Sequence, residues 1–209
     1  MMINRLTLIL FTTVFILTNT ISQAQDSTKA VNKSHNAENF VTSKWKDKNG
    51  SAQSLDEKFG DGTMKATRFL KNTKKIKVVY QLNKLCSDST CAKPYGIGNI
   101  FNHINDLKIT HGIKAKNYEF VVIIHGGGWP LVLNNEPENG VEKHATDNPF
   151  QSQVEKLVAE PGVKIYFCQN TAHSKKVSLN QMIPGIGFVT AGISAIVDLQ
   201  MEGYIYVQP

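Results

Sequence analysis

The chain has 209 residues, 41% of them hydrophobic, and a formal net charge of +6. This length supports one hydrophobic core and is too short for two full domains. The charge is uneven: residues 25–77 contain 12 Lys and Arg against 6 acids, whereas residues 78–209 contain 10 against 11. The lysines are scattered among polar residues and accompany no recognition motif, so we expect solvated charge and no nucleic-acid partner.

The first 24 residues have the order of a secretory signal peptide. Asn4 and Arg5 precede an apolar run over residues 6–17, and the triplet Ser22-Gln23-Ala24 has small residues at both outer positions, which predicts cleavage after Ala24. A retained membrane anchor is the alternative, but a spanning helix needs about 20 apolar residues. We therefore expect a periplasmic or secreted mature chain of 185 residues with no stable membrane span after cleavage.

Residues 25–73 form a polar, basic leader before the predicted domain, which covers residues 74–209. The leader lacks sustained periodicity and is typical of a linker or a loosely attached extension. Four aromatic residues interrupt it and indicate that part of it docks on the domain: Phe40, Trp45, Phe59 and Phe69.

From residue 75 onward, short apolar runs alternate with helical patterns. The runs predict strands over residues 76–82, 119–124, 163–167, 188–190 and 204–207, and the periodic segments predict helices over residues 97–107, 149–159 and 192–201. In the last helix the residues expected to point inward are Ile193, Ile196, Val197 and Met201. This order predicts an α/β fold, a three-layer sandwich in which helices flank a central, mainly parallel sheet of about five strands.

Cys168 follows the third predicted strand, at the edge of the sheet where ligands gather in such folds. A helix is expected to start at Asn170 or Thr171, and a thiol near a helix N-terminus has a stabilised thiolate, which would make Cys168 a nucleophile. The alternative is a buried cysteine that acts as a small hydrophobic residue.

Cys86 and Cys91 follow the first predicted strand and enclose four polar residues. In an exported protein a structural disulfide is the first expectation. The other interpretation is a redox pair, or a resolving partner for Cys168, which would remain the free thiol if the other two pair.

The second strand runs into His125 and three glycines, Gly126, Gly127 and Gly128. His125 either orients or deprotonates a bound group, or it is a hydrogen-bonded structural residue. The glycine amides suit an anion such as a sulfur oxyanion, or the glycines only make a sharp turn. The sequence His-Gly-Gly-Gly-Trp is similar to the oxyanion motif of lipases, but no Gly-x-Ser-x-Gly elbow occurs. No CxxC or HxxxH pair occurs either, so we expect no metal site and no cofactor.

Taken in order, VVYQL, NIFNHIN, FVVIIHGGG, VKIYFCQNT, residues 182–185, FVTAGISAIVDLQ and GYIYVQP resemble the DsrE/DsrF-like family of sulfur-relay proteins. The likeness runs from about residue 75 to residue 209 and is strongest in the last fifty residues. It implies a compact α/β fold, commonly assembled into trimers or hexamers, and a cysteine that carries sulfur as a persulfide. Cys168 matches that cysteine, and Asn170 and Thr171 match the residues that follow it. The Cys86 to Cys91 insertion departs from the family pattern.

Two functions follow as hypotheses. The first is an exported sulfur-binding or sulfur-transfer protein in which Cys168 carries sulfane sulfur, His125 orients the bound group, and the glycine amides with Asn170 and Thr171 bind the substrate. Cys86 and Cys91 would lock the rim or discharge the persulfide, and a sulfur donor or acceptor protein would be the partner. The second is a noncatalytic oligomeric ligand-binding module of the same fold, in which Cys168 is buried and unreactive.

Overall fold

The structure is a computed structural model that describes residues 49, 51, 53–138 and 140–209. The chain divides into two compact units, Met1–Thr67 and Arg68–Pro209. The predicted signal peptide and the aromatic residues Phe40 and Trp45 lie outside the described residues. Among the residues that are described, no helix has the length and apolar character needed to cross a bilayer.

The described part of the first unit contains two short helices, α3 (Leu55–Phe59) and α4 (Thr63–Ala66). Helix α3 begins at a capping box: the Glu57 amide donates to the Ser54 hydroxyl, and the Ser54 amide donates to the Glu57 carboxylate at 2.7 Å. Sequence periodicity did not predict these helices because each is shorter than two turns. Local capping therefore orders a segment for which the composition predicted a linker.

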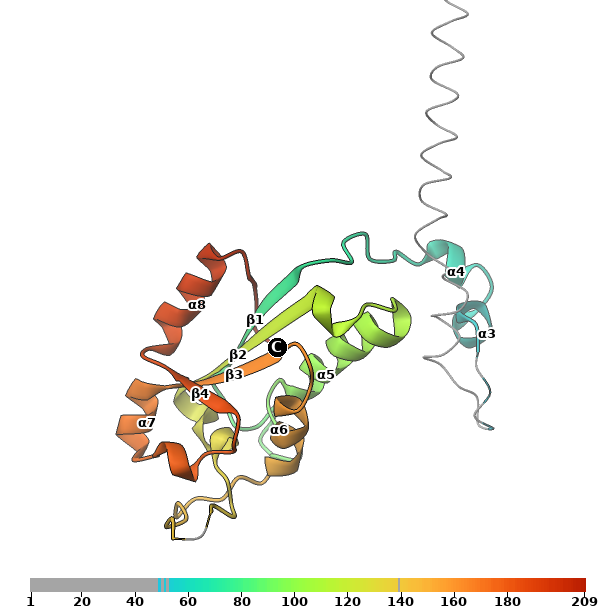
Figure 1. Cartoon of the computed structure of the whole chain (residues 1–209). Helices are drawn as coiled ribbons and strands as arrows, with labels where there is room; N and C mark the ends of the chain where they lie inside the picture. Colours follow the sequence, from blue (N-terminus) through green and yellow to red (C-terminus); the bar gives the residue numbers. More distant parts are fainter. Residues whose placement is uncertain (1–48, 50, 52, 139) are drawn as a thin grey trace, which may run out of the picture. The chain divides into compact units, whose positions relative to one another are not determined.

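The second unit contains a five-stranded sheet (Figure 1). Its strands lie in the order β4-β3-β2-β1-β5, and each neighbouring pair is parallel. This confirms the α/β class, and the sheet is fully rather than mainly parallel. The strand bounds are β1 (Ile76–Leu82), β2 (Tyr118–Ile124), β3 (Val163–Cys168), β4 (Ile186–Val189) and β5 (Ile205–Val207).

Four longer helices accompany the sheet, with α5 continuing directly into a π-helical turn, η1 (Asp106–Thr110). Short 3₁₀ turns connect other elements: η2 (Ala115–Asn117), η3 (Gly126–Val132) and η4 (Leu179–Gln181). The helices are α5 (Ile97–Asn105), α6 (Gln151–Val158), α7 (Gln169–Lys175) and α8 (Gly192–Met201). The positions of α5, α6 and α8 agree with the sequence pattern to within a few residues.

Alternate residues of the strands supply two cores, one on each face of the sheet. In β1, Val78 and Leu82 belong to the larger core, which α5 and α6 cover, whereas Val79 belongs to the smaller core with Ile196 of α8. Figure 1 shows α8 on the opposite side of the sheet from α5 and α6. Leu70 also packs against the larger core, so the end of the predicted leader docks on the domain. The helices thus form the outer layers of the predicted sandwich.

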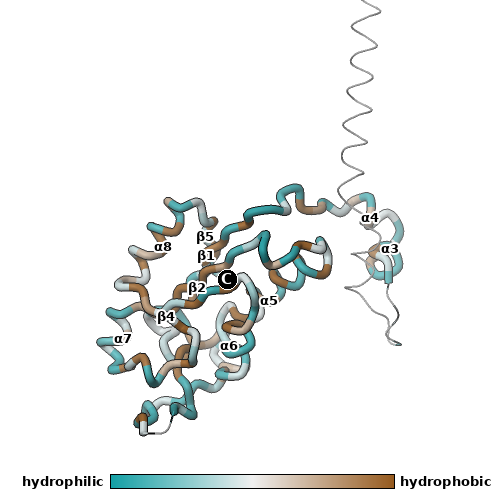
Figure 2. The backbone as a smooth tube through the Cα atoms, in the orientation of Figure 1, coloured by the Kyte–Doolittle hydropathy of each residue, from teal (hydrophilic) through white to brown (hydrophobic). Residues whose placement is uncertain are grey.

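The inward face of α8 differs from the prediction. Ile196 is buried, but Ile193, Val197 and Met201 are 69%, 50% and 84% exposed. Apolar residues occupy more than one side of this helix, so periodicity alone did not determine which side faces the sheet. Hydrophobic positions recur along β1 and along α8 (Figure 2), but only those of β1 are largely buried. An apolar stripe of three residues, Ile193, Val197 and Met201, therefore faces away from the core.

Candidate functional site

Cys168 is the last residue of β3 and is the free cysteine of the described chain. It pairs with Val189 of β4, and only 5% of its surface is exposed. On its other side, β3 pairs with β2, and the last pair in that register is Ile124 with Phe167. The next residues are His125, directly after β2, and Cys168 on β3, so these two residues lie opposite each other. The sheet therefore brings the two predicted catalytic residues side by side, on the face that α8 covers.

Hydrogen-bond donors converge on the Cys168 sulfur. Burial raises the pKa of the Cys168 thiol, but the amide and hydroxyl of Thr171 and the amides of Gly192 and Asn170 lie close enough to the sulfur to lower the pKa below its usual range. Three of these four donors come from the start of α7 and one comes from the start of α8. Four donors to one sulfur favour the thiolate, which is the nucleophilic form.

The Thr171 hydroxyl also links this cluster to the glycine turn. It accepts a hydrogen bond from the Gly126 amide at 3.2 Å, and it is one of the groups that lower the pKa of Cys168. Because an oxygen that accepts a hydrogen bond becomes a better donor, the Gly126 amide makes the Thr171 hydroxyl a stronger donor toward the nearby sulfur.

His125 is held by two residues that the sequence analysis did not identify, Gln81 and Tyr206. The Tyr206 hydroxyl donates to Gln81 Oε1, and Gln81 Nε2 lies 2.6 Å from His125 Nε2. In this network the Gln81 amide donates to His125 Nε2, so the neutral ring carries its proton on Nδ1. Burial lowers the pKa of His125, which also favours the neutral ring. His125 is therefore a positioned, uncharged neighbour of the thiolate.

Two observations explain why this network was missed. Tyr206 and Gln81 are 125 residues apart in the sequence and meet because β5 lies beside β1. The one available signal was Gln81 itself, a polar residue near the end of the apolar run IKVVYQL. A partly buried amide in such a strand needs a hydrogen-bond partner, and His125 and Tyr206 supply it.

The glycines form a turn that runs close to the end of β1. A Cβ atom on Gly128 would lie 2.5 Å from the Leu82 carbonyl oxygen, and one on Gly127 would lie 3.0 Å from the Asn83 carbonyl oxygen. Gly126 has a φ of +53°, and the Gly128 amide donates to the His125 carbonyl at 3.0 Å. The interpretation as a sharp, closely packed turn therefore accounts for all three glycines, and Gly128 is buried.

The remaining predicted substrate-binding residues line one cleft. It has a volume of about 380 Å³, and Lys175 Nζ lies 5.8 Å from the centroid of the Trp129 ring in its wall. The lining contains a lysine, an amide side chain, two hydroxyls and two glycines but no carboxylate, so the cleft favours an anion. Cys168 does not line the cleft, but Asn170 and Thr171 line it and also lie beside the Cys168 sulfur. The lining is Gly126, Gly127, Trp129, Asn170, Thr171, Ser174 and Lys175.

Cys86 and Cys91 form a disulfide with each other, with their Cα atoms 4.9 Å apart. The backbone of Cys86 also forms an isolated antiparallel β-bridge with that of Pro94, and both cysteines pack against the larger core. Strand β2 separates β1 from β3, so the strands that lead to Cys86 and to Cys168 are roughly 10 Å apart. A resolving reaction with Cys168 would require the loop to move as well as the disulfide to open. Within the described residues, no three His, Cys, Asp or Glu side chains gather closely enough to hold a metal ion.

Comparison with known proteins identifies the family. The chain is similar to a protein of unknown function, MTH1491 from Methanobacterium thermoautotrophicum, with 20% identity and a TM-score of 0.48 over 64% of this chain and 99% of that chain. No curated protein matches the chain. The sequence model of the DsrE/DsrF-like family matches residues 105–209, about half of the chain and the part that holds β2 to β5, Cys168 and His125. The chain therefore belongs to the DsrE/DsrF-like family.

Proposed function

We propose that the chain is a sulfur-binding or sulfur-transfer protein that carries sulfane sulfur as a persulfide on Cys168. The observation that supports this most is that three amides and one hydroxyl lie near a sulfur at the carboxyl edge of the sheet and lower its pKa. Such donors stabilise a thiolate and would equally stabilise a persulfide anion, in which the charge stays on sulfur. Family membership supports a sulfur-relay role, and the cysteine itself is the feature that would carry it.

The transfer needs no external oxidant. The Cys168 thiolate attacks the terminal sulfur of a polysulfide; a new S–S bond forms, the bond behind that terminal sulfur breaks, and the shortened polysulfide leaves with the electron pair. In the return step an acceptor thiolate attacks the outer sulfur of the persulfide, and Cys168 leaves as the thiolate. His125 is a positioning residue in this scheme because the neutral ring, fixed by Gln81, limits where the added sulfur can lie. Gly126, Gly127, Asn170 and Thr171 would bind an anionic donor in the adjoining cleft.

The disulfide has a structural role in this proposal and locks the loop after β1. A Cys86→Ser/Cys91→Ser double variant should then load sulfur as the wild type does, and it should lose about 2 kcal/mol of stability, the loop-closure term for so short a loop. A variant that loads sulfur but no longer releases it to a thiol acceptor would instead assign the pair to discharge of the persulfide.

The decisive experiment is the intact mass of the mature protein before and after treatment with sodium polysulfide, without reductant. We expect added sulfur that maps to Cys168 and leaves on treatment with a thiol reductant. The Cys168→Ser variant should gain none, while the Cys86→Ser/Cys91→Ser variant serves as the matched control for other cysteines. A Cys168→Ser protein that still accepts and passes on sulfane sulfur would refute the proposal.

A second function is favoured by two other observations. Cys168 is 5% exposed, and the apolar stripe of α8 is open to solvent. Both fit a noncatalytic oligomeric module that binds a ligand in the cleft near Trp129. Under this function Cys168 would resist alkylation in the native state and the polysulfide mass shift would be absent. In both proposals the protein is exported to the periplasm or secreted, and a homotrimer or homohexamer would cover the stripe formed by Ile193, Val197 and Met201.

A further inference from the structure

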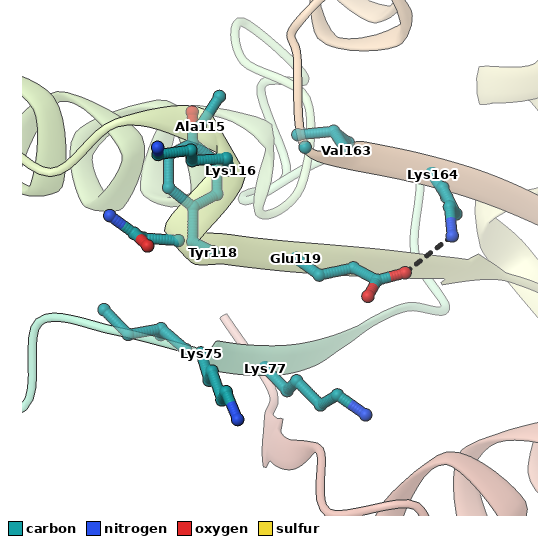
Figure 3. Close-up of a pocket in the computed structure, with 11 residues that line it drawn as sticks. Lys75, Lys77, Ala115, Lys116, Tyr118, Glu119, Val163 and Lys164 are labelled. Atoms are coloured by element: carbon teal, nitrogen blue, oxygen red, sulfur yellow. Dashed lines mark hydrogen bonds and ion pairs between the residues drawn. The ribbon is translucent and has the colours of Figure 1, made fainter.

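A second pocket lies at the opposite, amino-terminal edge of the sheet from Cys168. It has a volume of about 390 Å³ and is built from the starts of β1, β2 and β3 (Figure 3). Four lysines and one carboxylate line it, together with an apolar part that includes Ile76, Val163 and the ring of Tyr118. The charged residues are Lys75, Lys77, Lys116, Lys164 and Glu119.

Internal contacts neutralise only part of this charge. Lys164 Nζ lies 2.6 Å from the Glu119 carboxylate, and Lys77 Nζ donates to the Glu202 carbonyl at 3.2 Å. The exposed Lys75 and Lys116 contact no carboxylate within the part of the chain that the structure describes. Figure 3 shows Lys75 at the start of β1 and Lys116 in the turn before the neighbouring strand, β2. The pocket therefore has two ammonium groups to offer a ligand.

The apolar wall of the pocket is fixed. Tyr118 is 4% exposed, and its hydroxyl donates to Glu160, which also accepts from Lys108 at 2.7 Å. The hydroxyl thus points away from the pocket, and the ring is what remains to line it. Gly162, with a φ of +86°, packs so closely that a Cβ atom there would lie 2.8 Å from the Tyr118 ring. The Tyr118 ring is therefore a fixed part of the pocket lining.

We propose that this pocket is a binding site for an organic anion with an apolar body. The anionic group would pair with the ammonium groups of Lys75 and Lys116, and the apolar body would lie against Tyr118, Ile76 and Val163. A cation is disfavoured because four lysines face one carboxylate that Lys164 already occupies. The adjoining cleft toward α8 contains Asp198 and Glu202, which confines the positive charge to the edge of the sheet. The site is separate from Cys168 and does not depend on sulfur transfer.

The test is calorimetric titration of the full chain with sodium decanoate below its micelle concentration. Lys75→Gln/Lys116→Gln should weaken decanoate binding about tenfold, because each of the two exposed ammonium groups contributes about threefold. The matched control is Lys74→Gln/Lys114→Gln, which removes the same charge from exposed neighbours that do not line the pocket. We expect this control to change binding less than about twofold. Circular dichroism melting curves confirm that both variants fold.

Three outcomes would overturn the proposal. Equal weakening by both double variants would mean general electrostatic attraction without a site. Inorganic phosphate that binds as tightly as decanoate would show that the apolar wall contributes nothing. The third outcome is that the protein sediments with phosphatidylglycerol vesicles only when Lys75 and Lys116 are present and does not bind free decanoate. The ligand would then be an anionic membrane surface and not a small organic anion.

Discussion

The Thr171 hydroxyl gives the sharpest test of the thiolate site. In a Thr171→Val variant the shape of the side chain is kept, but the hydroxyl donor to the Cys168 sulfur is lost, while the Thr171 amide remains. A hydrogen bond to a charged group contributes about 1.5–3 kcal/mol, and one pKa unit corresponds to about 1.4 kcal/mol. The pKa of Cys168 should therefore rise by about one unit or somewhat more. The freed Gly126 amide is exposed and can bond to water, so stability should change little.

The assay is the rate of alkylation by iodoacetamide as a function of pH, followed by intact mass. Low exposure of Cys168 slows the reaction in every variant, so the midpoint of the pH profile, rather than the absolute rate, measures the pKa. Thr171→Ser retains the hydroxyl and should behave as the wild type. Ser174→Ala lines the same cleft without a bond to the sulfur and controls for altered access. Coincident midpoints in Thr171→Val and wild type would refute the assignment of the hydroxyl as a donor to the thiolate.

Three further predictions concern the fold and its assembly. Gly128→Ala should lower the free energy of unfolding in urea by about 1–3 kcal/mol, because its Cβ would lie 2.5 Å from the Leu82 carbonyl oxygen. The control Gly98→Ala has open space around it in α5 and should be neutral or stabilising by up to about 1 kcal/mol. Equal effects of the two substitutions would disprove the close approach. Burial lowers the pKa values of His125 and of His103, and for His103 it outweighs the opposite effect of the nearby Asp106 carboxylate. Below the ordinary histidine pKa of 6.5, the unfolded chain therefore binds more protons than the folded chain. The melting temperature should therefore fall as the pH drops from 6.5 toward the lowered values, and a flat profile would contradict the shifts. Val197→Asp should reduce the mass measured by light scattering if α8 packs against a second copy, and an unchanged oligomer would exclude that face.

The strands and their order of appearance follow from the sequence alone. The runs IKVVYQL, EFVVII and VKIYF are largely apolar, because both faces of a parallel strand are covered, and these segments are strands in the structure. The helical repeats between them require crossover connections and hence a parallel sheet. The position of Cys168 at the carboxyl edge follows from the same pattern, since the residue ends the third strand.

The site around Cys168 was decided by the tertiary structure. Strand order places Tyr206 against Gln81 and Gln81 against His125, and no local pattern encodes contacts between residues so far apart. The Gly192 amide reaches the sulfur only because α8 begins over the end of β3, and packing decided that Ile196, and not Val197, faces the sheet. Secondary structure is written in local periodicity, which acts over a few residues. The thiolate environment depends on which strands are neighbours, and that is set by the global balance of burial and hydrogen bonding in the folded chain.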